Sequence, residues 1–230
     1  QAKFKIYFSY IWNLMKFNFL YHFGRYLLLL KNSFSKPEKF SIYWKETLRQ
    51  MVEIGIDSLP IVIIISLFLG AVLTVQTAYQ FTSPLLSKSI IGSIVTNSSI
   101  LEMAPSVVCL ILAGKIGSSI SSELGTMRIS EQIDALEIMG VNSAGFLVMP
   151  KVLATTLTIP LLVIMSGFLT ITSGMFVGEW TGALTRTEFM SGGVEYFIPF
   201  TVTFAIIKAF TFGFIISSVS AYIGYFTEGG

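Results

Sequence analysis

The sequence has little charge for its length and almost no cysteine or histidine. Only 12% of its 230 residues are Asp, Glu, Lys or Arg, whereas soluble domains contain about 25%. It has a single cysteine, Cys109, and a single histidine, His22. One cysteine cannot form a disulfide within the chain, and one cysteine with one histidine cannot complete a zinc or haem site. We therefore expect this chain to bind no metal and no cofactor.

The sequence also lacks the short motifs of common hydrolases and nucleotide-binding enzymes. Gly114-Lys115 is not a P-loop, because the upstream glycine and the following Ser or Thr are missing. There is no G-x-S-x-G or H-E-x-x-H motif, and no pair of carboxylates typical of a hydrolase. The net charge of +2 is too small to indicate a nucleic-acid partner. We therefore predict no catalytic residues.

What the sequence does contain is long apolar runs. A helix needs about 20 predominantly apolar residues to cross a bilayer, and 53% of this chain is hydrophobic. Four runs are long enough, at about residues 59–78, 91–117, 146–177 and 196–225. The predicted fold class is an all-α integral membrane protein with four transmembrane helices. Residues 118–145 are predicted to be a polar segment that forms no span.

The first 56 residues have a different pattern, in which apolar and basic side chains alternate. An apolar stripe at helical spacing runs through residues 4–15, with lysines beside it. This pattern is typical of a helix in the membrane interface, and an amphipathic helix packed on protein is the alternative. A second amphipathic stretch covers residues 40–56. We predict interfacial helices over residues 1–56 and a transmembrane domain over residues 57–230.

The basic residues are distributed unevenly, and this predicts an orientation. Nine of the fifteen Lys and Arg residues precede Met51, and basic residues accumulate on the cytoplasmic side of a membrane. The N-terminus is therefore expected in the cytoplasm. The loops around Lys88 and Arg186 have one basic residue each and are expected outside, so residues 118–145 return to the cytoplasm.

The most specific part of the sequence is EMAPSVVCLILAGKIGSSISSELGTMRISEQIDALEIMG, from Glu102 to Gly140. It resembles the signature of the Mla-type permeases, which show AGR-x-GS, then ELGTM, then EQIDALE-x-MG. The run PKVLATTLTIPLL from Pro150 and a membrane lysine near Phe210 also fit. The resemblance covers about residues 55–230.

The sequence departs from the family pattern in three places. Lys115 stands where the family usually has Arg, and Met103-Ala104 replaces a more usual Val-Gly or Leu-Gly. Family members usually continue past a Glu-Gly-Gly step, here residues 228–230, into one more membrane helix. A fifth transmembrane helix is therefore expected to be missing from this sequence.

The resemblance implies a transporter subunit with several partners. Permeases of this family form homodimers, and two cytoplasmic ABC ATPases that bind ATP and Mg drive them. An MCE-domain protein lies on the periplasmic side, and a small cytoplasmic accessory subunit can be present. Together they move phospholipids between the inner and outer membranes of a diderm envelope, which maintains outer-membrane lipid asymmetry, and plastids have a relative. The resemblance thus implies a bacterial inner membrane.

A short cytoplasmic amphipathic helix is predicted over residues 126–140. Ile133, Leu136 and Met139 recur on one face, whereas three acidic residues share another. Spacing alone does not distinguish a coupling helix, which inserts into an ATPase, from a plain linker helix, but the resemblance implies coupling. The residues expected to couple to the ATPase are Arg128, Glu131, Gln132, Asp134, Ala135, Leu136, Glu137, Met139 and Gly140.

Glu102 and Lys208 are charged residues predicted to lie deep in the membrane. A charge there costs a few kcal/mol unless it is paired or faces a cavity. Both are predicted at a depth of about 16–18 Å, which allows a salt bridge or a shared polar pocket. We interpret them as lining a lipid path, and the alternative is an ion pair that only fixes helix packing. Further lipid-path candidates, for which helix packing is an equal alternative, are Gln76, Tyr79, Leu73 and Asn97.

Two other functions remain open at this point. An intramembrane lipid-modifying enzyme would use Glu102 as a base, but no nucleophile or histidine is evident near it. A membrane scaffold that recruits an MCE protein would need no coupling helix. Glu123 is interpreted as part of a solvated face that contacts a partner.

Overall fold

The computed structural model describes residues 19–35, 40–81 and 87–227. The predicted apolar stripe at residues 4–15 and the Glu-Gly-Gly step lie outside these residues. All regular elements in the described part are helices. They are a helix over residues 19–33, α2 (Phe40–Gln80), α3 (Ser89–Ser98), the π-helix η1 (Ser99–Val108), α4 (Cys109–Ile129), α5 (Gln132–Ile138), α6 (Ser143–Trp180), α7 (Arg186–Glu195) and α8 (Pro199–Tyr225).

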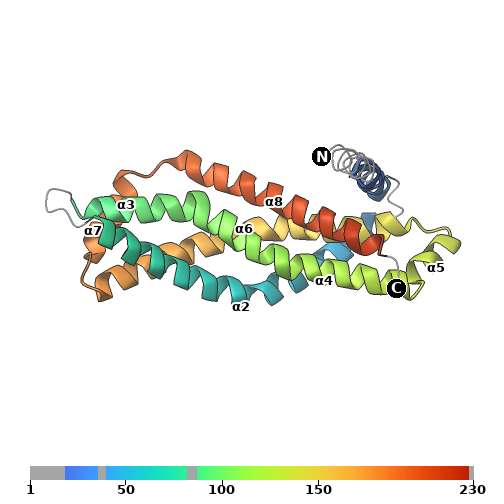
Figure 1. Ribbon diagram of the computed structural model, residues 1–230, viewed down its shortest axis with the longest axis horizontal. Coiled ribbons are helices and arrows are strands. Elements are labelled where there is room, and N and C mark those ends of the chain that lie inside the picture. The colour runs from blue at the N-terminus through green and yellow to red at the C-terminus, as the bar shows by residue number, and fades with distance from the viewer. Residues whose placement is uncertain (1–18, 36–39, 82–86, 228–230) are drawn as a thin grey trace, which may run out of the picture.

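Four helical rods are long and apolar enough to cross a membrane. They are Tyr43–Gln80, Ser89–Ile129, Ser143–Trp180 and Pro199–Tyr225. The rods extend along one axis, with α7 at one end and α5 at the other (Figure 1). This arrangement confirms the predicted all-α integral membrane fold with four visible transmembrane helices.

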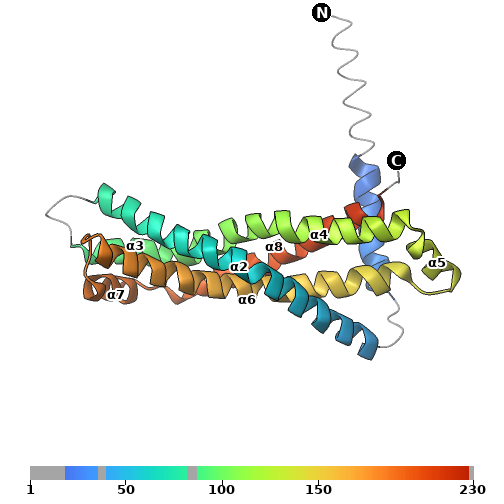
Figure 2. The ribbon, with the colours of Figure 1, turned by 90° about the horizontal axis from the view of Figure 1, so that it is seen from below.

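The helix over residues 19–33 is oriented differently from the rods. It runs across the long axis of the bundle, near the α5 end (Figure 2). A helix that lies across the transmembrane direction is parallel to the membrane surface, as an interfacial helix must be.

The second predicted amphipathic stretch does not form a helix of its own. α2 is one uninterrupted helix of 41 residues, so the predicted boundary between residues 56 and 57 falls inside it. The sequence pattern Asp57, Ser58 and Pro60 resembles a helix start, but Pro60 lies within α2. Proline lacks an amide hydrogen and crowds the carbonyls of the preceding turn. The Lys115 ammonium on α4 donates to the Asp57 carbonyl, so a neighbouring helix contributes a hydrogen bond to the backbone of the turn before Pro60.

α2 and α6 pack closely because small residues face each other. A Cβ atom on Gly70 would lie 2.0 Å from the carbonyl oxygen of Thr170, so only glycine fits there. One turn earlier on each helix, the Ser66 hydroxyl donates to that of Ser166 at 2.7 Å. Close backbone approach and interhelical hydrogen bonds are the interactions that associate helices inside a bilayer.

The second rod is longer at its α5 end than the sequence predicted. α4 continues to Ile129, whereas the predicted span ended near residue 117. The polar residues in this extension pack against α8: the Ser121 hydroxyl donates to the Ser220 carbonyl at 2.8 Å, and a Cβ on Gly224 would clash with the backbone of Ser121. The low hydropathy of this segment therefore reflects helix contacts and not the end of a helix.

A ten-residue π-helix, η1, interrupts this rod between α3 and α4 and contains Pro105. Pro105 cannot donate a backbone hydrogen bond, and its ring crowds the carbonyl of Leu101. A wider turn relieves both effects. π-Helical turns are rare and occur frequently at functional sites, and this one contains Glu102.

Candidate functional site

The salt bridge that the sequence allowed between Glu102 and Lys208 does not form. Glu102 is exposed on η1 and Lys208 is half-buried on α8, and among the described residues neither forms an ion pair. α8 begins farther from the α7 end of the bundle than α3 does (Figure 1), and the role of the two residues in a lipid path stays a prediction.

An apolar groove of about 180 Å³ lies between η1, α6 and α8. Ile100, Ala104, Gly167 and Val202 are among the residues that line it. Glu102 is two residues from both Ile100 and Ala104, so it lies on the other face of η1. A carboxylate at membrane depth must face water, a polar lipid group or another protein chain. The exposed Glu102 and the apolar groove are therefore separate features on two sides of one helix.

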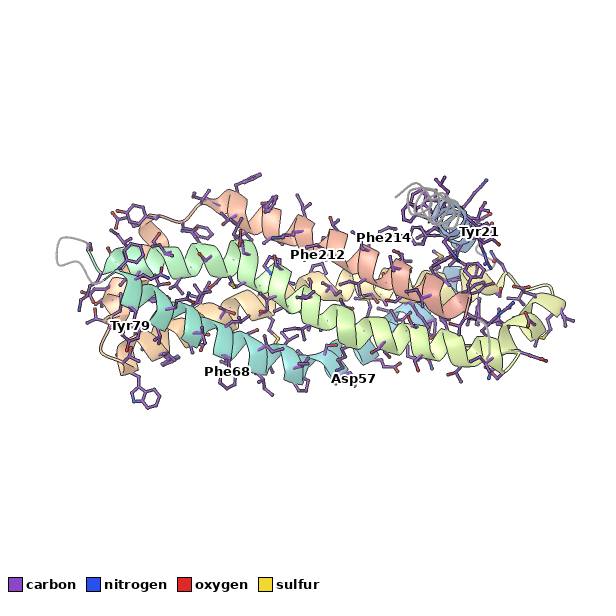
Figure 3. All side chains as sticks on the ribbon, viewed as in Figure 1. Tyr21, Asp57, Phe68, Tyr79, Phe212 and Phe214 are labelled. Atoms are coloured by element: carbon purple, nitrogen blue, oxygen red, sulfur yellow. The ribbon has the colours of Figure 1, made fainter. Side chains whose placement is uncertain are left out.

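The other predicted lipid-path residues lie apart from Glu102 and Lys208. Gln76 is exposed, and Tyr79 is 80% exposed on α2 towards the α7 end (Figure 3). Leu73 packs against a buried cluster that includes Phe189. The Asn97 amide donates to the carbonyl of Tyr196 at 3.3 Å, so it joins α3 to the segment before α8. The structure thus gives Leu73 and Asn97 packing contacts and leaves Gln76 and Tyr79 at the surface.

α5 closes the bundle at the end opposite α7 (Figure 1). The helix has seven residues and is therefore shorter than the predicted segment 126–140. Glu131 separates it from α4 with a φ of 58°, a left-handed conformation that an α-helix of L-residues cannot continue through. Across this turn Arg128 forms an ion pair with Asp134 at 2.5 Å.

α5 has a buried face and an exposed apolar tip. Ile133 is fully buried and Leu136 packs partly buried against the same core, as predicted. Met139 was predicted on that face, but α5 ends at Ile138 and both residues point outwards, with Ile138 88% exposed. Of the predicted ATPase contacts, those at the surface are Glu131, Gln132, Ala135, Glu137, Met139 and Gly140.

The three acidic residues of this segment have different surroundings. Oε1 of Glu137 accepts hydrogen bonds from the Ser143 hydroxyl at 2.8 Å and the Tyr225 hydroxyl at 3.0 Å. Asp134 is paired with Arg128. Of these three acidic residues, Glu131 is the one whose carboxylate has no partner among the described residues.

A buried ion pair that the sequence analysis missed lies towards the α5 end. Lys151 on α6 is only 4% exposed, and its Nζ lies 2.6 Å from Oε2 of Glu123 on α4. Gln50 on α2 accepts a longer bond of 3.5 Å. Glu123 itself is exposed, with 49% of its side chain accessible, so it lies on a solvated face as interpreted, and the sequence analysis missed only its buried partner. The signal in the sequence was a single lysine in the apolar run after Pro150, since a buried ammonium requires a partner.

A polar crevice lies beside this pair, between α2, α4 and α6. Its lining includes Glu53, Asp57, Lys115, Glu123 and Lys151. Of the charged residues in the stretch 40–56, Glu53 lines this crevice, whereas Lys45 and Arg49 are exposed.

The helix over residues 19–33 is attached to the end of α8. Nδ1 of His22 lies 2.8 Å from the Tyr222 hydroxyl, and the Tyr26 hydroxyl lies 2.8 Å from that of Ser218. The Arg25 guanidinium lies 4.0 Å from the ring centre of Phe226. Large apolar side chains on the rest of this helix, such as Phe19, Leu20 and Leu28, are exposed. The helix therefore packs on protein along one side and leaves apolar residues free along another.

Comparisons with known proteins agree with this architecture. The family model described as Permease MlaE matches residues 47–230. A probable ABC transporter permease protein of Rickettsia bellii is 36% identical over 82% of this chain and 73% of its own length. A second, from Rickettsia prowazekii, is 35% identical over 90% of this chain and 79% of its own. The chloroplastic protein TRIGALACTOSYLDIACYLGLYCEROL 1 of Arabidopsis thaliana is 32% identical over 84% of this chain and 55% of its own.

Proposed function

The chain belongs to the MlaE permease family, and we propose that this membrane permease is the lipid-conducting subunit of an ABC transporter in a bacterial inner membrane. Its cargo is phospholipid, moved between the inner and outer membranes. The Arabidopsis relative has the name of a galactolipid, which supports a lipid cargo. A cytoplasmic ATPase binds ATP and Mg and supplies the energy.

The observation that carries this proposal is the apolar tip at α5. Ile129, Ile138 and Met139 are all exposed at the end of the bundle. Apolar side chains gathered in water are unfavourable unless a partner covers them. We propose that the ATPase covers this tip, with Glu131 and Gln132 beside it.

Glu102 and Lys208 supply the polar part of the lipid path. An exposed carboxylate and a half-buried ammonium at membrane depth are costly unless they face water or a polar headgroup. Two copies of the chain, placed with these surfaces towards a shared cavity, satisfy this requirement. The periplasmic MCE-domain protein belongs at the α7 end, and a small accessory subunit belongs with the ATPase.

The test compares substitutions at opposite ends of the bundle. We expect Glu131→Lys combined with Ile138→Asp to release the ATPase, or to abolish lipid-stimulated ATP hydrolysis, in a complex purified in detergent. Glu195→Lys, at an exposed position in α7, is the matched control and is expected to change neither. Glu137 is not substituted in this test, because its carboxylate accepts hydrogen bonds from Ser143 and Tyr225.

Each outcome bears on a different alternative. If the α5 double variant binds and stimulates the ATPase normally, α5 is only a linker and the coupling proposal fails. If the chain alone modifies lipid without ATP, the intramembrane enzyme is correct instead. If neither lipid movement nor ATP dependence exists while the MCE partner still binds, the chain is a scaffold.

A further inference from the structure

Three residues from three helices meet at the α5 end of the bundle. Glu137 lies on α5, Ser143 is the first residue of α6 and Tyr225 is the last of α8. The Ser143 and Tyr225 hydroxyls both reach Oε1 of Glu137, at 2.8 and 3.0 Å, and lie 2.7 Å from each other. Ser143 and Tyr225 are buried. We call these residues the hydroxyl–carboxylate triad.

The triad has three hydrogen-bond contacts but only two hydroxyl hydrogens to fill them. Each hydroxyl carries one hydrogen, and an ionised carboxylate carries none. Two hydrogens serve three contacts, so either both hydroxyls donate to Glu137, or one donates to the other and only one to Glu137. Rotation of a hydroxyl hydrogen exchanges these arrangements. The triad can therefore tolerate small displacements of α5 without losing all its bonds.

α5 is too short to hold its own position. A helix of seven residues is unstable without tertiary contacts. Its connection to α4 passes through the left-handed turn at Glu131, and the Arg128–Asp134 pair beside that turn is 35% and 47% exposed, so it contributes only about 0–1 kcal/mol. Ile133 and Leu136 pack α5 on the core, and the buried hydroxyls of the triad add directional hydrogen bonds that lead to α6 and α8.

α8 extends this connection into the membrane. It is a continuous helix from Pro199 to Tyr225, and Lys208 lies about 25 Å from Tyr225 along it. A displacement of Tyr225 therefore moves the helix that carries the ammonium of the proposed lipid path.

We propose that the hydroxyl–carboxylate triad transmits movement of α5 to α8, with Tyr225 as the positioning residue that couples ATP hydrolysis to Lys208. This inference rests on the proposed function. It assigns Glu137 to coupling within the chain and not to the surface that docks the ATPase.

The test uses two tyrosines one helical turn apart. Tyr225→Phe removes the triad hydroxyl and keeps the ring. Tyr222→Phe removes a hydroxyl that bonds His22 of the N-terminal helix and is the matched control. Each complex is reconstituted in vesicles of phosphatidylethanolamine and phosphatidylglycerol with a trace of fluorescent phosphatidylethanolamine. The quantity measured is lipid moved per ATP hydrolysed, together with ATPase retention and the thermal unfolding midpoint.

We expect Tyr225→Phe to retain the ATPase and lower the lipid moved per ATP about fivefold, the factor that corresponds to one hydrogen bond of about 1 kcal/mol. Tyr222→Phe should leave the ratio unchanged. Glu137→Ala should reproduce the loss, whereas Glu137→Gln keeps an acceptor oxygen and should restore the wild-type ratio. Glu137 is at an exposed position, so the comparison of Glu137→Ala with Glu137→Gln tests the proposal even if Tyr225→Phe unfolds.

The opposite results separate this inference from the function on which it rests. Wild-type ratios in both Tyr225→Phe and Glu137→Ala would overturn the triad proposal and leave the transporter intact. Equal losses in Tyr225→Phe and Tyr222→Phe would show a general effect at the end of α8 and would also overturn it. A wild-type complex that moves no lipid with ATP would remove both proposals.

Discussion

The two side chains of the ion pair between Lys151 and Glu123 are buried to different degrees. The lysine side chain is 5% exposed and the glutamate side chain is 49% exposed. A buried ammonium without a partner loses hydration that nothing replaces, whereas a half-exposed carboxylate stays hydrated. The effect of breaking this pair should therefore depend on which residue is removed.

We expect Glu123→Ala to destabilise the protein by roughly 2–4 kcal/mol, since it leaves the Lys151 ammonium buried with only a long contact to Gln50. Lys151→Met, which keeps the shape of the side chain and removes the charge, should cost less than about 1.5 kcal/mol. Thermal unfolding in detergent measures the difference. Arg49→Gln, which breaks an exposed pair with Glu46, is the control and should change stability by less than about 1 kcal/mol. Equal losses from both core substitutions would contradict the argument from burial.

Lys208 is expected to matter for transport and not for assembly. Lys208→Ala should reduce ATP-dependent lipid movement at least about tenfold, which corresponds to a lost interaction of about 1.4 kcal/mol. Binding of the ATPase should be unchanged, because Lys208 lies far along α8 from α5. Lys208→Arg keeps the charge and should retain most activity. Normal transport by the alanine variant, measured with fluorescent phosphatidylethanolamine in vesicles, would remove Lys208 from the lipid path.

At the scale of elements, two glycines in transmembrane rods should respond oppositely to the same substitution. A Cβ on Gly70 would overlap the α6 backbone at Thr170, whereas a Cβ on Gly114 meets nothing within 4 Å. Gly70→Ala should separate α2 from α6 and cost roughly 1–3 kcal/mol. Gly114→Ala should be neutral, or stabilising by up to about 1 kcal/mol, because alanine favours helix. Unfolding midpoints in detergent test this, and a neutral Gly70→Ala would mean that the close α2–α6 contact is absent.

The capping box of α7 should make that helix sensitive to acid. Glu188 accepts bonds from the Thr185 backbone amide and hydroxyl, each at 2.8 Å. The backbone bond, more than the hydroxyl bond, lowers the pKa of this carboxyl below its ordinary value. The stabilisation is therefore complete above the unfolded pKa and is lost as pH falls through the folded one. The protection of amides at the start of α7 against exchange, relative to the intrinsic exchange rate at each pH, should fall below about pH 4.5, and Glu188→Gln should remove that pH dependence.

The sequence predicted which segments cross the membrane, because hydropathy depends only on local composition. It did not predict where the helices begin and end, since the polar residues near those ends can either pack against other helices or face water. Asp57 and Lys115 were separate polar signals in the sequence, but in the fold one satisfies the backbone of the other. Glu123 and Lys151 were likewise unrelated in sequence, and only packing of α4 on α6 pairs them.

At the scale of the whole molecule, the rods are longer than a bilayer is thick. α6 has 38 residues and is therefore about 57 Å long, whereas the hydrocarbon core is about 30 Å. Lys151 lies about 12 Å from the α5 end of this helix. The buried ion pair, the polar crevice and the charged part of α2 all lie in this half of the bundle. A bundle that extends beyond the hydrocarbon at its α5 end keeps these charges out of lipid, and the same extension places α5 within reach of a soluble ATPase.

This arrangement requires that the α5 end face the cytoplasm, and single-cysteine labelling tests it. The helix over residues 19–33 lies at the α5 end (Figure 2), and the basic N-terminal region is expected to stay in the cytoplasm. Cys109 is 2% exposed and should not react, so the unmodified chain is the control. In spheroplasts, a membrane-impermeant maleimide should label Ser191→Cys on α7 at once and Gln132→Cys on α5 only after permeabilisation. Labelling of both from outside would contradict the four-span arrangement. Labelling of Gln132→Cys alone would show that the protein has the inverse orientation. α5 would then lie where no cytoplasmic ATPase can reach it, and both the proposed coupling and the proposed orientation would be wrong.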